Sequence, residues 1–581
     1  MGWSVSKYMG YSERSLIVIR NMAAAHFLSG FCLFLVGWGY GLPNRIVFGI
    51  PTIAYLTALF FSREAFRDFH FKSLHKSLET LPHVAMGVIA LFLILNILFC
   101  LLPPAENLET DAFNYHFVIP WQYYLRGGVV NLDWSVPDKY PLYLQMAQLP
   151  FTVISFPWIV KIGNMIALPT LLVVAWNLFR LMGLSRNNAA WMVALLSSFS
   201  LFVKQYGTAM FDLANAAYCL LGFLYLLRAT LSRKGSDMLW GAAILGMACA
   251  TKTFLIYYAI VWFVAFFVWT IFCQRKSMAK SDFALSLLPL LMGIVFLTPV
   301  WCRNFLLTGN PFYPLFLKWF GTLIENEGFY VVMRNVTGQH GYGRSLVDFL
   351  LGPLRLVLPF HRRFDYWVDP ILLVFLFGAF AELKSRWREI PGLMALIAFL
   401  FYMAFFFTTQ EARYLYPFWV MVVALGAPWI FLHIQRKWRG PVFAVQIIVG
   451  ISMFFLFHRQ ALGWLRHGPL DQYLYRASYS FVWNENLESK RIHQLCLANV
   501  GTPKLPRDVL DILYFTVPVK LIQHFNSTIS ITNPRALEGC DAFMLGDQDP
   551  EERDDPPSQQ PRLVTKEIFL FEQTKTDESV R

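Results

Sequence analysis

An acid, a histidine and several aromatic side chains follow directly on an apolar run in the segment 109–120, Glu-Thr-Asp-Ala-Phe-Asn-Tyr-His-Phe-Val-Ile-Pro. The preceding residues, 84–102, have the composition of a membrane span. An ionisable side chain at such a depth is costly unless it is paired, so it is a functional candidate by default. At the edge of a membrane, a carboxylate can accept a proton from a hydroxyl group. The segment therefore favours an enzyme in the membrane over a passive pore.

Asp111 begins a predicted helix that ends near Tyr124. At helical spacing, Asp111, Tyr115 and Val118 share one face of this helix. Aspartate also caps helix N-termini, and a cap can still take part in chemistry. Histidine transfers protons near neutral pH, but at an interface His116 is more readily interpreted as a hydrogen-bonded residue than as a base.

The composition predicts a protein solvated mainly by lipid. The chain of 581 residues is 56% hydrophobic and 15% charged, whereas an ordinary soluble domain is about 25% charged. The formal net charge is +12, but the basic residues are scattered between apolar runs. Scattered basic residues are typical of topology signals and of contacts with anionic lipids. We therefore expect the membrane as a partner and no nucleic acid.

Thirteen apolar runs approach the length of about 20 residues that a membrane-crossing helix needs. When these spans alternate, the short basic connections, such as 180–186 and 228–234, all fall on one face. An excess of Lys and Arg marks cytoplasmic loops, so we place the amino terminus in the cytoplasm. The predicted spans are 22–40, 45–62, 84–102, 158–180, 189–203, 211–228, 238–252, 255–273, 283–301, 367–381, 390–408, 415–433 and 441–457.

The opposite face carries two long loops, 103–157 and 302–366, where binding and catalytic residues are expected. It also carries the tail, 458–581, which has a helical pattern over 460–497 and strand-like runs after it, at 521–531, 542–545 and 563–571. We therefore predict an all-α polytopic membrane bundle of about 13 transmembrane helices over 1–457. A small C-terminal α/β domain follows on the outer face.

Several cations map to the outer ends of spans, where few are expected. They are Lys161, Lys204, Lys252, Arg303 and Arg413, and the acids Asp111, Asp212 and Glu411 map to the same level. Cations gathered at headgroup depth suit a lipid phosphate or diphosphate, because Arg forks and Lys point charges bind phosphate oxygens. The alternative for each residue is that its charge only marks the end of a helix.

Five elements carry a resemblance to a known family, in order along roughly residues 84–433. They are Asp111…Tyr115-His116…Pro120, Phe211-Asp212-Leu213, the small-residue run from Gly246 to Thr251-Lys252, Arg303-Asn304…Gly309-Asn310-Pro311, and Arg413-Tyr414…Pro417. Together they resemble the polytopic GT-C glycosyltransferases. Within that family, the chain resembles the protein O-mannosyltransferase-like branch and the lipid A aminoarabinose transferases.

The resemblance implies an integral-membrane enzyme that moves a hexosyl or pentosyl group from a polyprenyl-phosphate donor to an acceptor hydroxyl. The acceptor would be a lipid or a glycan, on the non-cytoplasmic face of a bacterial inner (plasma) membrane. It implies Asp111 as the catalytic base. Glu106 and Glu109 lie nearby in the sequence and are alternatives for this role. The substrate-binding residues would be Tyr115, His116, Asp212, Lys252, Arg303, Asn304, Arg413 and Tyr414.

The chain departs from the family pattern in two places. Many relatives have Asp-Glu at the first motif, whereas Ala112 follows Asp111 here, which argues against a metal site built on that Glu. We name no metal ligand and no certain cofactor, and a divalent metal stays open. The two predicted spans before residue 84 are also an addition to the family pattern.

Two other classes of function are compatible with many spans. A transporter or flippase of a lipid-linked sugar would also hold charges near lipid phosphates, but it predicts internal repeats and broken helices near the bilayer midplane. No clear repeat is visible, and the charges lie toward one face. A structural membrane scaffold would leave the outer cations without a purpose.

Overall fold

The structure is a computed structural model of the whole chain. It describes residues 10–67, 82–102, 109, 111, 115–132, 137–155, 159–252, 255–273, 279–320, 341, 343–357, 368–408 and 410–459, and four strands between 495 and 565. The described chain divides into two compact units. The first comprises 1–33, 45–110 and 140–461, and the second comprises 34–44, 111–139 and 462–581.

Helices dominate the described residues before 460. In chain order they are α1 (Gly10–Gly39), α2 (Asn44–Arg67), α4 (His83–Cys100), α5 (Val118–Leu125), η3 (Pro137–Lys139), α6 (Tyr143–Ser155), η4 (Ile159–Ile166), α7 (Ala167–Leu181), α8 (Arg186–Ser197), α9 (Ser200–Val203), α10 (Asp212–Ser232), α11 (Gly235–Cys249), α12 (Tyr257–Val268), η5 (Trp269–Cys273), α13 (Lys280–Thr308), α14 (Leu317–Phe320), α16 (Leu346–Val357), α17 (Ile371–Arg386), α18 (Ile390–Phe407), η6 (Ala412–Leu415), α19 (Tyr416–His433) and α20 (Arg436–Phe457).

The first unit is a multi-pass membrane bundle. Within the described residues, nine helices are long and apolar enough to cross a membrane. They correspond to nine of the thirteen predicted spans. The other four predicted spans coincide with the shorter helices α8, α11, α12 and α17, so the total of thirteen stays a prediction. The chain is therefore an integral membrane protein that crosses the bilayer several times.

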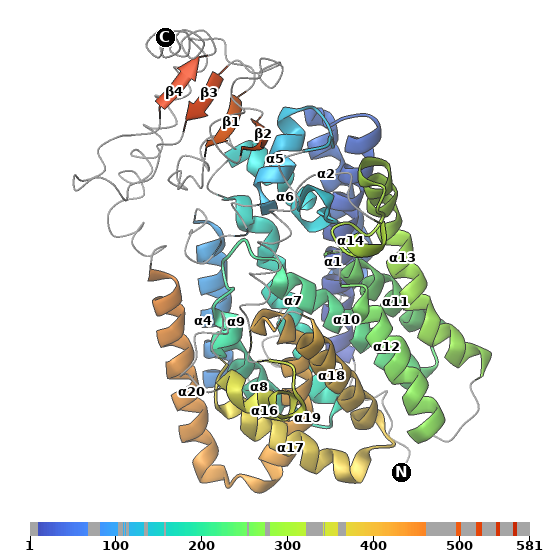
Figure 1. Ribbon diagram of the computed structural model, residues 1–581. Coiled ribbons are helices and arrows are strands. Elements are labelled where there is room, and N and C mark those ends of the chain that lie inside the picture. The colour runs from blue at the N-terminus through green and yellow to red at the C-terminus, as the bar shows by residue number, and fades with distance from the viewer. Residues whose placement is uncertain are drawn as a thin grey trace. The chain divides into compact units, whose positions relative to one another are not determined.

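The core of the bundle is built around α10, almost all of whose side chains are buried. Figure 1 shows α10 inside the bundle, where it packs against α7 and α11. Glycines allow the close approach. A Cβ atom at Gly222 would lie 2.8 Å from the backbone nitrogen of Leu245, and one at Gly246 would lie 2.6 Å from Met292 Cβ of α13. Small residues at such positions let membrane helices pack backbone to backbone.

The helical part of the second unit is held by backbone hydrogen bonds between two glycine-containing turns. Leu42 N donates to Gly127 O at 2.8 Å, and Val129 N donates to Gly37 O at 2.9 Å. Gly41 has a φ of +95°, and a Cβ atom there would lie 2.5 Å from Gly127 O. A side chain at position 41 would therefore clash as well as strain the backbone.

The described strands of the tail form one mixed sheet in the order β2-β1-β3-β4. The strands are β1 (Leu495–Val500), β2 (Val519–Phe525), β3 (Ala542–Leu545) and β4 (Arg562–Thr565). β1 pairs parallel with β2 and β3, and β3 pairs antiparallel with β4.

The tail departs from the sequence prediction in one place. Residues 495–497 were expected at the end of a helix and instead begin β1, a run of apolar and small residues that pairs on both edges. The rest of that predicted helix, 460–494, lies outside the described residues, so an α/β domain remains a prediction.

Candidate functional site

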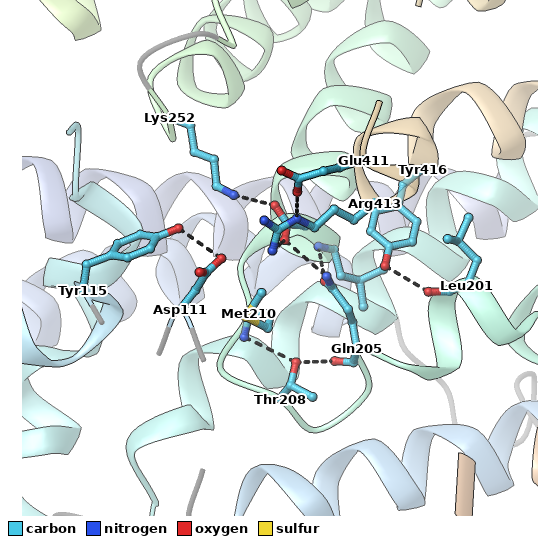
Figure 2. Close-up of polar contacts among 12 residues, drawn as sticks. Asp111, Tyr115, Leu201, Gln205, Thr208, Met210, Lys252, Glu411, Arg413 and Tyr416 are labelled. Carbon is cyan, nitrogen blue, oxygen red and sulfur yellow. Dashed lines mark hydrogen bonds and ion pairs between the residues drawn. The ribbon is translucent and has the colours of Figure 1, made fainter. Parts of the chain in front are cut away.

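Asp212 lies at the N-terminal end of α10 and is the centre of a buried charge cluster. Figure 2 shows other members of this cluster, Lys252, Arg413 and Glu411. Its side chain is almost completely buried. Lys252 Nζ lies 2.5 Å from Asp212 Oδ1, and Arg413 Nη1 lies 3.7 Å from Asp212 Oδ2. Gln205 Nε2 also donates to Oδ2, at 3.2 Å. One carboxylate therefore holds two cations and one amide.

The helix arrangement explains why these residues meet. A connection of two residues, Arg233 and Lys234, joins α10 to α11, so the two helices run antiparallel and the end of α11 returns to the start of α10. Lys252 follows the end of α11, within reach of Asp212. The 3₁₀ helix η6, which carries Arg413, also packs against α10, although it lies much later in the chain. An acid in the first turn of a helix is also favoured by the helix dipole.

A second acid and an aromatic ring complete the cluster. Glu411 Oε2 accepts from Arg413 Nε at 2.5 Å. The ring of Tyr414 has Lys252 Nζ 5.3 Å from its centroid and Arg413 Cζ 5.5 Å from it, both within cation–π range. The formal negative charges of Asp212 and Glu411 equal the formal positive charges of Lys252 and Arg413. The arrangement thus presents an ammonium, a guanidinium fork and a ring with fixed positions.

Lys161 belongs to a separate buried ion pair. Its Nζ lies 3.2 Å from Glu109 Oε1, and both side chains are almost completely buried. The other oxygen, Glu109 Oε2, accepts from the backbone nitrogen of Ala209 at 2.8 Å. Lys204, another of the expected cations, lies with its Nζ 5.9 Å from the ring centroid of Phe457. Lys161 is therefore paired with Glu109, whereas Lys252 and Arg413 share Asp212.

Asp111 belongs to the second compact unit, whereas Asp212 belongs to the first. In Figure 2, Asp111 and Tyr115 point toward each other, and the hydroxyl of Tyr115 lies 3.5 Å from Asp111 Oδ2. This contact has the helical spacing predicted from the sequence. The ring of Tyr115 lies 4.1 Å from the ring of the buried residue His116, centroid to centroid.

Arg303 and Asn304 lie near the C-terminal end of α13, and both are buried. Asn304 Nδ2 donates to the backbone oxygen of Tyr313 at 3.3 Å. Gly309 ends the helix with a φ of +73°, and Asn310 Nδ2 donates to Leu315 O at 2.7 Å. The Arg-Asn…Gly-Asn-Pro element is therefore in large part a helix stop followed by a turn that its two asparagines hold.

The sequence did not single out Gln205 as a residue of the cluster. It bridges Asp212 and the backbone nitrogen of Leu213, which donates to Gln205 Oε1 at 2.9 Å. A lone amide beside an apolar run gives no sequence signal. Within the described residues, no three His, Cys, Asp or Glu side chains gather in a group that could hold a metal ion.

No family model matches the chain, and no curated protein matches it. Among solved structures, it is similar to ArnT from Cupriavidus metallidurans bound to undecaprenyl phosphate, with 12% identity and a TM-score of 0.46 over 78% of this chain and 88% of ArnT. It is also similar to the oligosaccharyltransferase AglB from Archaeoglobus fulgidus in complex with an inhibitory peptide and a dolichol-phosphate. There the identity is 11% and the TM-score 0.39, over 75% of this chain and 64% of AglB.

Identities and TM-scores this low say nothing of activity, so the function must be argued from the side chains of this chain.

Proposed function

We propose that this protein is an integral-membrane glycosyltransferase that moves one sugar from a polyprenyl-phosphate donor to an acceptor hydroxyl on the non-cytoplasmic face. The observation that carries the proposal is the pair of cations, Lys252 and Arg413, held on Asp212 in a multi-pass membrane bundle. A lipid phosphate at headgroup depth needs such fixed cations. The bundle around them supplies the apolar surface that a polyprenyl chain needs.

The chemistry assigns a task to each group. The oxygen of the acceptor hydroxyl forms a bond to the anomeric carbon of the sugar. The bond between that carbon and the phosphate oxygen breaks, and its electron pair stays on the phosphate. Lys252, Arg413 and Arg303 would stabilise the charge that develops there. The proton of the hydroxyl would pass to Asp111 as general base.

Asp212 is better suited to hold cations than to accept a proton. Two cations and an amide contact its carboxylate, so both of its oxygens already have donors as partners. An acid in this setting positions Lys252 and Arg413 before the donor arrives, which is the preorganisation that electrostatic catalysis requires. Tyr115, His116, Asn304 and Tyr414 would then contact the sugar or the acceptor, with lipid or glycan as the acceptor class. The mechanism names no metal.

The topology belongs to the same proposal. Thirteen spans would place the amino terminus in the cytoplasm and the tail, 458–581, outside. The charge cluster lies beside the ends of α10 and α11 that this topology assigns to the outer face. We propose the bacterial inner membrane as the location.

The test is transfer of a radiolabelled sugar from a polyprenyl-phosphate donor by the purified protein in lipid nanodiscs. The variants are Arg413→Ala and Lys252→Ala. A charge-assisted hydrogen bond contributes about 1.5–3 kcal/mol, so donor affinity should fall roughly ten- to a hundredfold in each. Arg386→Ala is the matched control, because Arg386 also pairs with two acids, Glu382 and Glu389.

Sugar transfer that needs the acceptor and is lost in both cluster variants but kept in Arg386→Ala supports the proposal. In sealed proteoliposomes, movement of the intact lipid-linked sugar across the bilayer without transfer would identify a flippase instead. Unchanged donor affinity in Arg413→Ala would remove the cluster from the donor site.

A further inference from the structure

The turn Lys204–Phe211 between α9 and α10 is held by side chains from four distant parts of the first unit. Gly207 N donates to Asn96 Oδ1 of α4 at 2.9 Å, and Ala209 N donates to Glu109 Oε2 at 2.8 Å. Asn164 Nδ2 of η4 donates to Thr208 O at 2.8 Å. His458 Nε2, just after α20, lies 2.7 Å from Tyr206 O. Each of these four residues is buried.

The turn needs these partners because of where it lies. Residues 205–211 are buried, and the segment is neither a long helix nor a strand that could satisfy its own N–H and C=O groups. A buried backbone group without a hydrogen bond costs free energy. Packing adds a further constraint, because a Cβ atom at Gly207, whose φ is +64°, would lie 2.2 Å from Phe99 Cβ. The turn therefore has little freedom to shift.

The position of the turn sets the position of the charge cluster. Gln205 lies within the turn and contacts Asp212 Oδ2 and Leu213 N. Asp212 follows the turn directly and holds Lys252 and Arg413. A displacement of the turn would therefore displace the acid on which both cations depend.

Glu109 differs from the other three partners because it is an acid. Its two oxygens do different things: Oε2 accepts from Ala209 N, and Oε1 pairs with Lys161. A buried ion pair contributes little net stability compared with apolar side chains of the same size, although removal of one partner is costly. A contribution to the stability of the fold therefore does not explain why two charged side chains, rather than two apolar ones, occupy this position.

We propose that Glu109 is a positioning residue of the transferase. Through its hydrogen bond to Ala209 N, it fixes the turn 204–211 and thereby Asp212 with its two cations. This inference rests on the proposed function. It also assigns Glu109 a different task from that of a general base, for which it was an alternative to Asp111 in the sequence.

The experiment compares two double variants, of which only one offers an acceptor to Ala209 N. Glu109→Gln with Lys161→Met removes both charges but keeps an oxygen that can accept from Ala209 N. Glu109→Leu with Lys161→Met removes the charges and the acceptor. Both variants remove the two charges of the pair together, so neither leaves one of them buried without the other. Hydrogen exchange at the amide of Ala209 should be faster in the Leu variant only.

We expect the Gln variant to keep most of the wild-type kcat. The Leu variant should lose roughly 10²-fold in kcat, the scale associated with a displacement of about 1 Å in an active site. Donor KM should also rise in the Leu variant, because the displaced cations bind the donor phosphate, and it should stay near the wild-type value in the Gln variant.

The possible outcomes distinguish a positioning role of Glu109 from a chemical role and from no role. If both double variants are equally inactive while the wild type transfers sugar, the carboxylate itself is needed for chemistry and the positioning role is wrong. If both are as active as the wild type, the hydrogen bond to Ala209 has no role in the reaction. A wild-type protein that transfers no sugar would instead refute the proposed function, and the exchange of Ala209 would still report whether Glu109 holds the turn.

Discussion

Lys252 Nζ and Asp212 Oδ1 lie 2.5 Å apart, although 40 positions separate the two residues in the chain. The contact joins the end of one buried helix to the start of its antiparallel neighbour. Both groups are removed from water, so their attraction must offset a desolvation cost that a surface pair would not incur. A pair of this kind is weak evidence for stability, and its value is better sought in what it positions.

Asp212→Asn should be strongly destabilising. The amide keeps the shape of the side chain but leaves Lys252 and Arg413 without the charge that both contact. Breaking a buried pair by removal of one partner typically costs about 3–5 kcal/mol. Unfolding of the purified protein in mixed micelles, followed by tryptophan fluorescence, would measure this loss.

Glu389→Gln is the control for this prediction, since Glu389 is exposed and pairs with Arg386. Exposed ion pairs contribute about 0–1 kcal/mol, so this variant should stay near the wild type. Equal losses in the two variants would contradict the special role of Asp212.

Arg303→Ala should weaken donor binding while expression stays intact. The side chain is buried on α13, and the sequence element that carries it suggests a phosphate ligand. Arg303→Lys should recover only part of the affinity, because an ammonium cannot replace a bidentate fork. Binding of polyprenyl phosphate to the detergent-solubilised protein is the measurement. Wild-type affinity in Arg303→Ala would exclude this residue from the donor site.

The sequence predicted the components of the cluster but not their pairing. Charges at the ends of apolar runs identified Asp212, Lys252 and Arg413, because a charge next to a span stands out against an apolar background. Which cation contacts which acid depends on the order of helices in the bundle. Lys161 had the same sequence pattern as Lys252, yet it pairs with Glu109.

The turn before α10 could not have been predicted. Its partners Asn96, Asn164 and His458 are single polar residues within or beside apolar runs. A hydrogen bond between elements more than 40 residues apart follows no periodic pattern, so the sequence alone gives it no signal. The helices themselves were predictable because each span needs a long apolar run. The total number of spans was harder to predict, because four of the predicted spans coincide with shorter helices.

Labelling from outside should distinguish the two faces of the protein. The basic connections predict that Ser232 lies inside and Ser345 outside, and both are exposed in the structure. In sealed cells, a membrane-impermeant thiol reagent should label Ser345→Cys but not Ser232→Cys. Permeabilised cells should give labelling at both positions, with the native cysteines of the parent chain as background. Labelling of Ser232→Cys in sealed cells would reverse the topology.

Asp111→Asn should remove the general base and leave the fold intact. The amide keeps the size of the side chain and can still accept from Tyr115, but it cannot take a proton at neutral pH. General-base catalysis contributes typically 10²–10⁴-fold in rate, so transfer should fall by roughly that factor. Radiolabelled transfer in membranes measures it, with protein levels matched to the wild type.

Two further variants separate this role from its alternatives. Tyr115→Phe removes the hydroxyl that lies 3.5 Å from Asp111 Oδ2, and it should cost less than Asp111→Asn because the base itself remains. Asp111→Ala should be at least as damaging as Asp111→Asn, since it also removes the oxygen that the hydroxyl of Tyr115 contacts. Near-normal turnover in Asp111→Asn together with a loss in Asp111→Ala would leave Asp111 as a cap alone. If the double variants of Glu109 and Lys161 were then both inactive, the base would be Glu109.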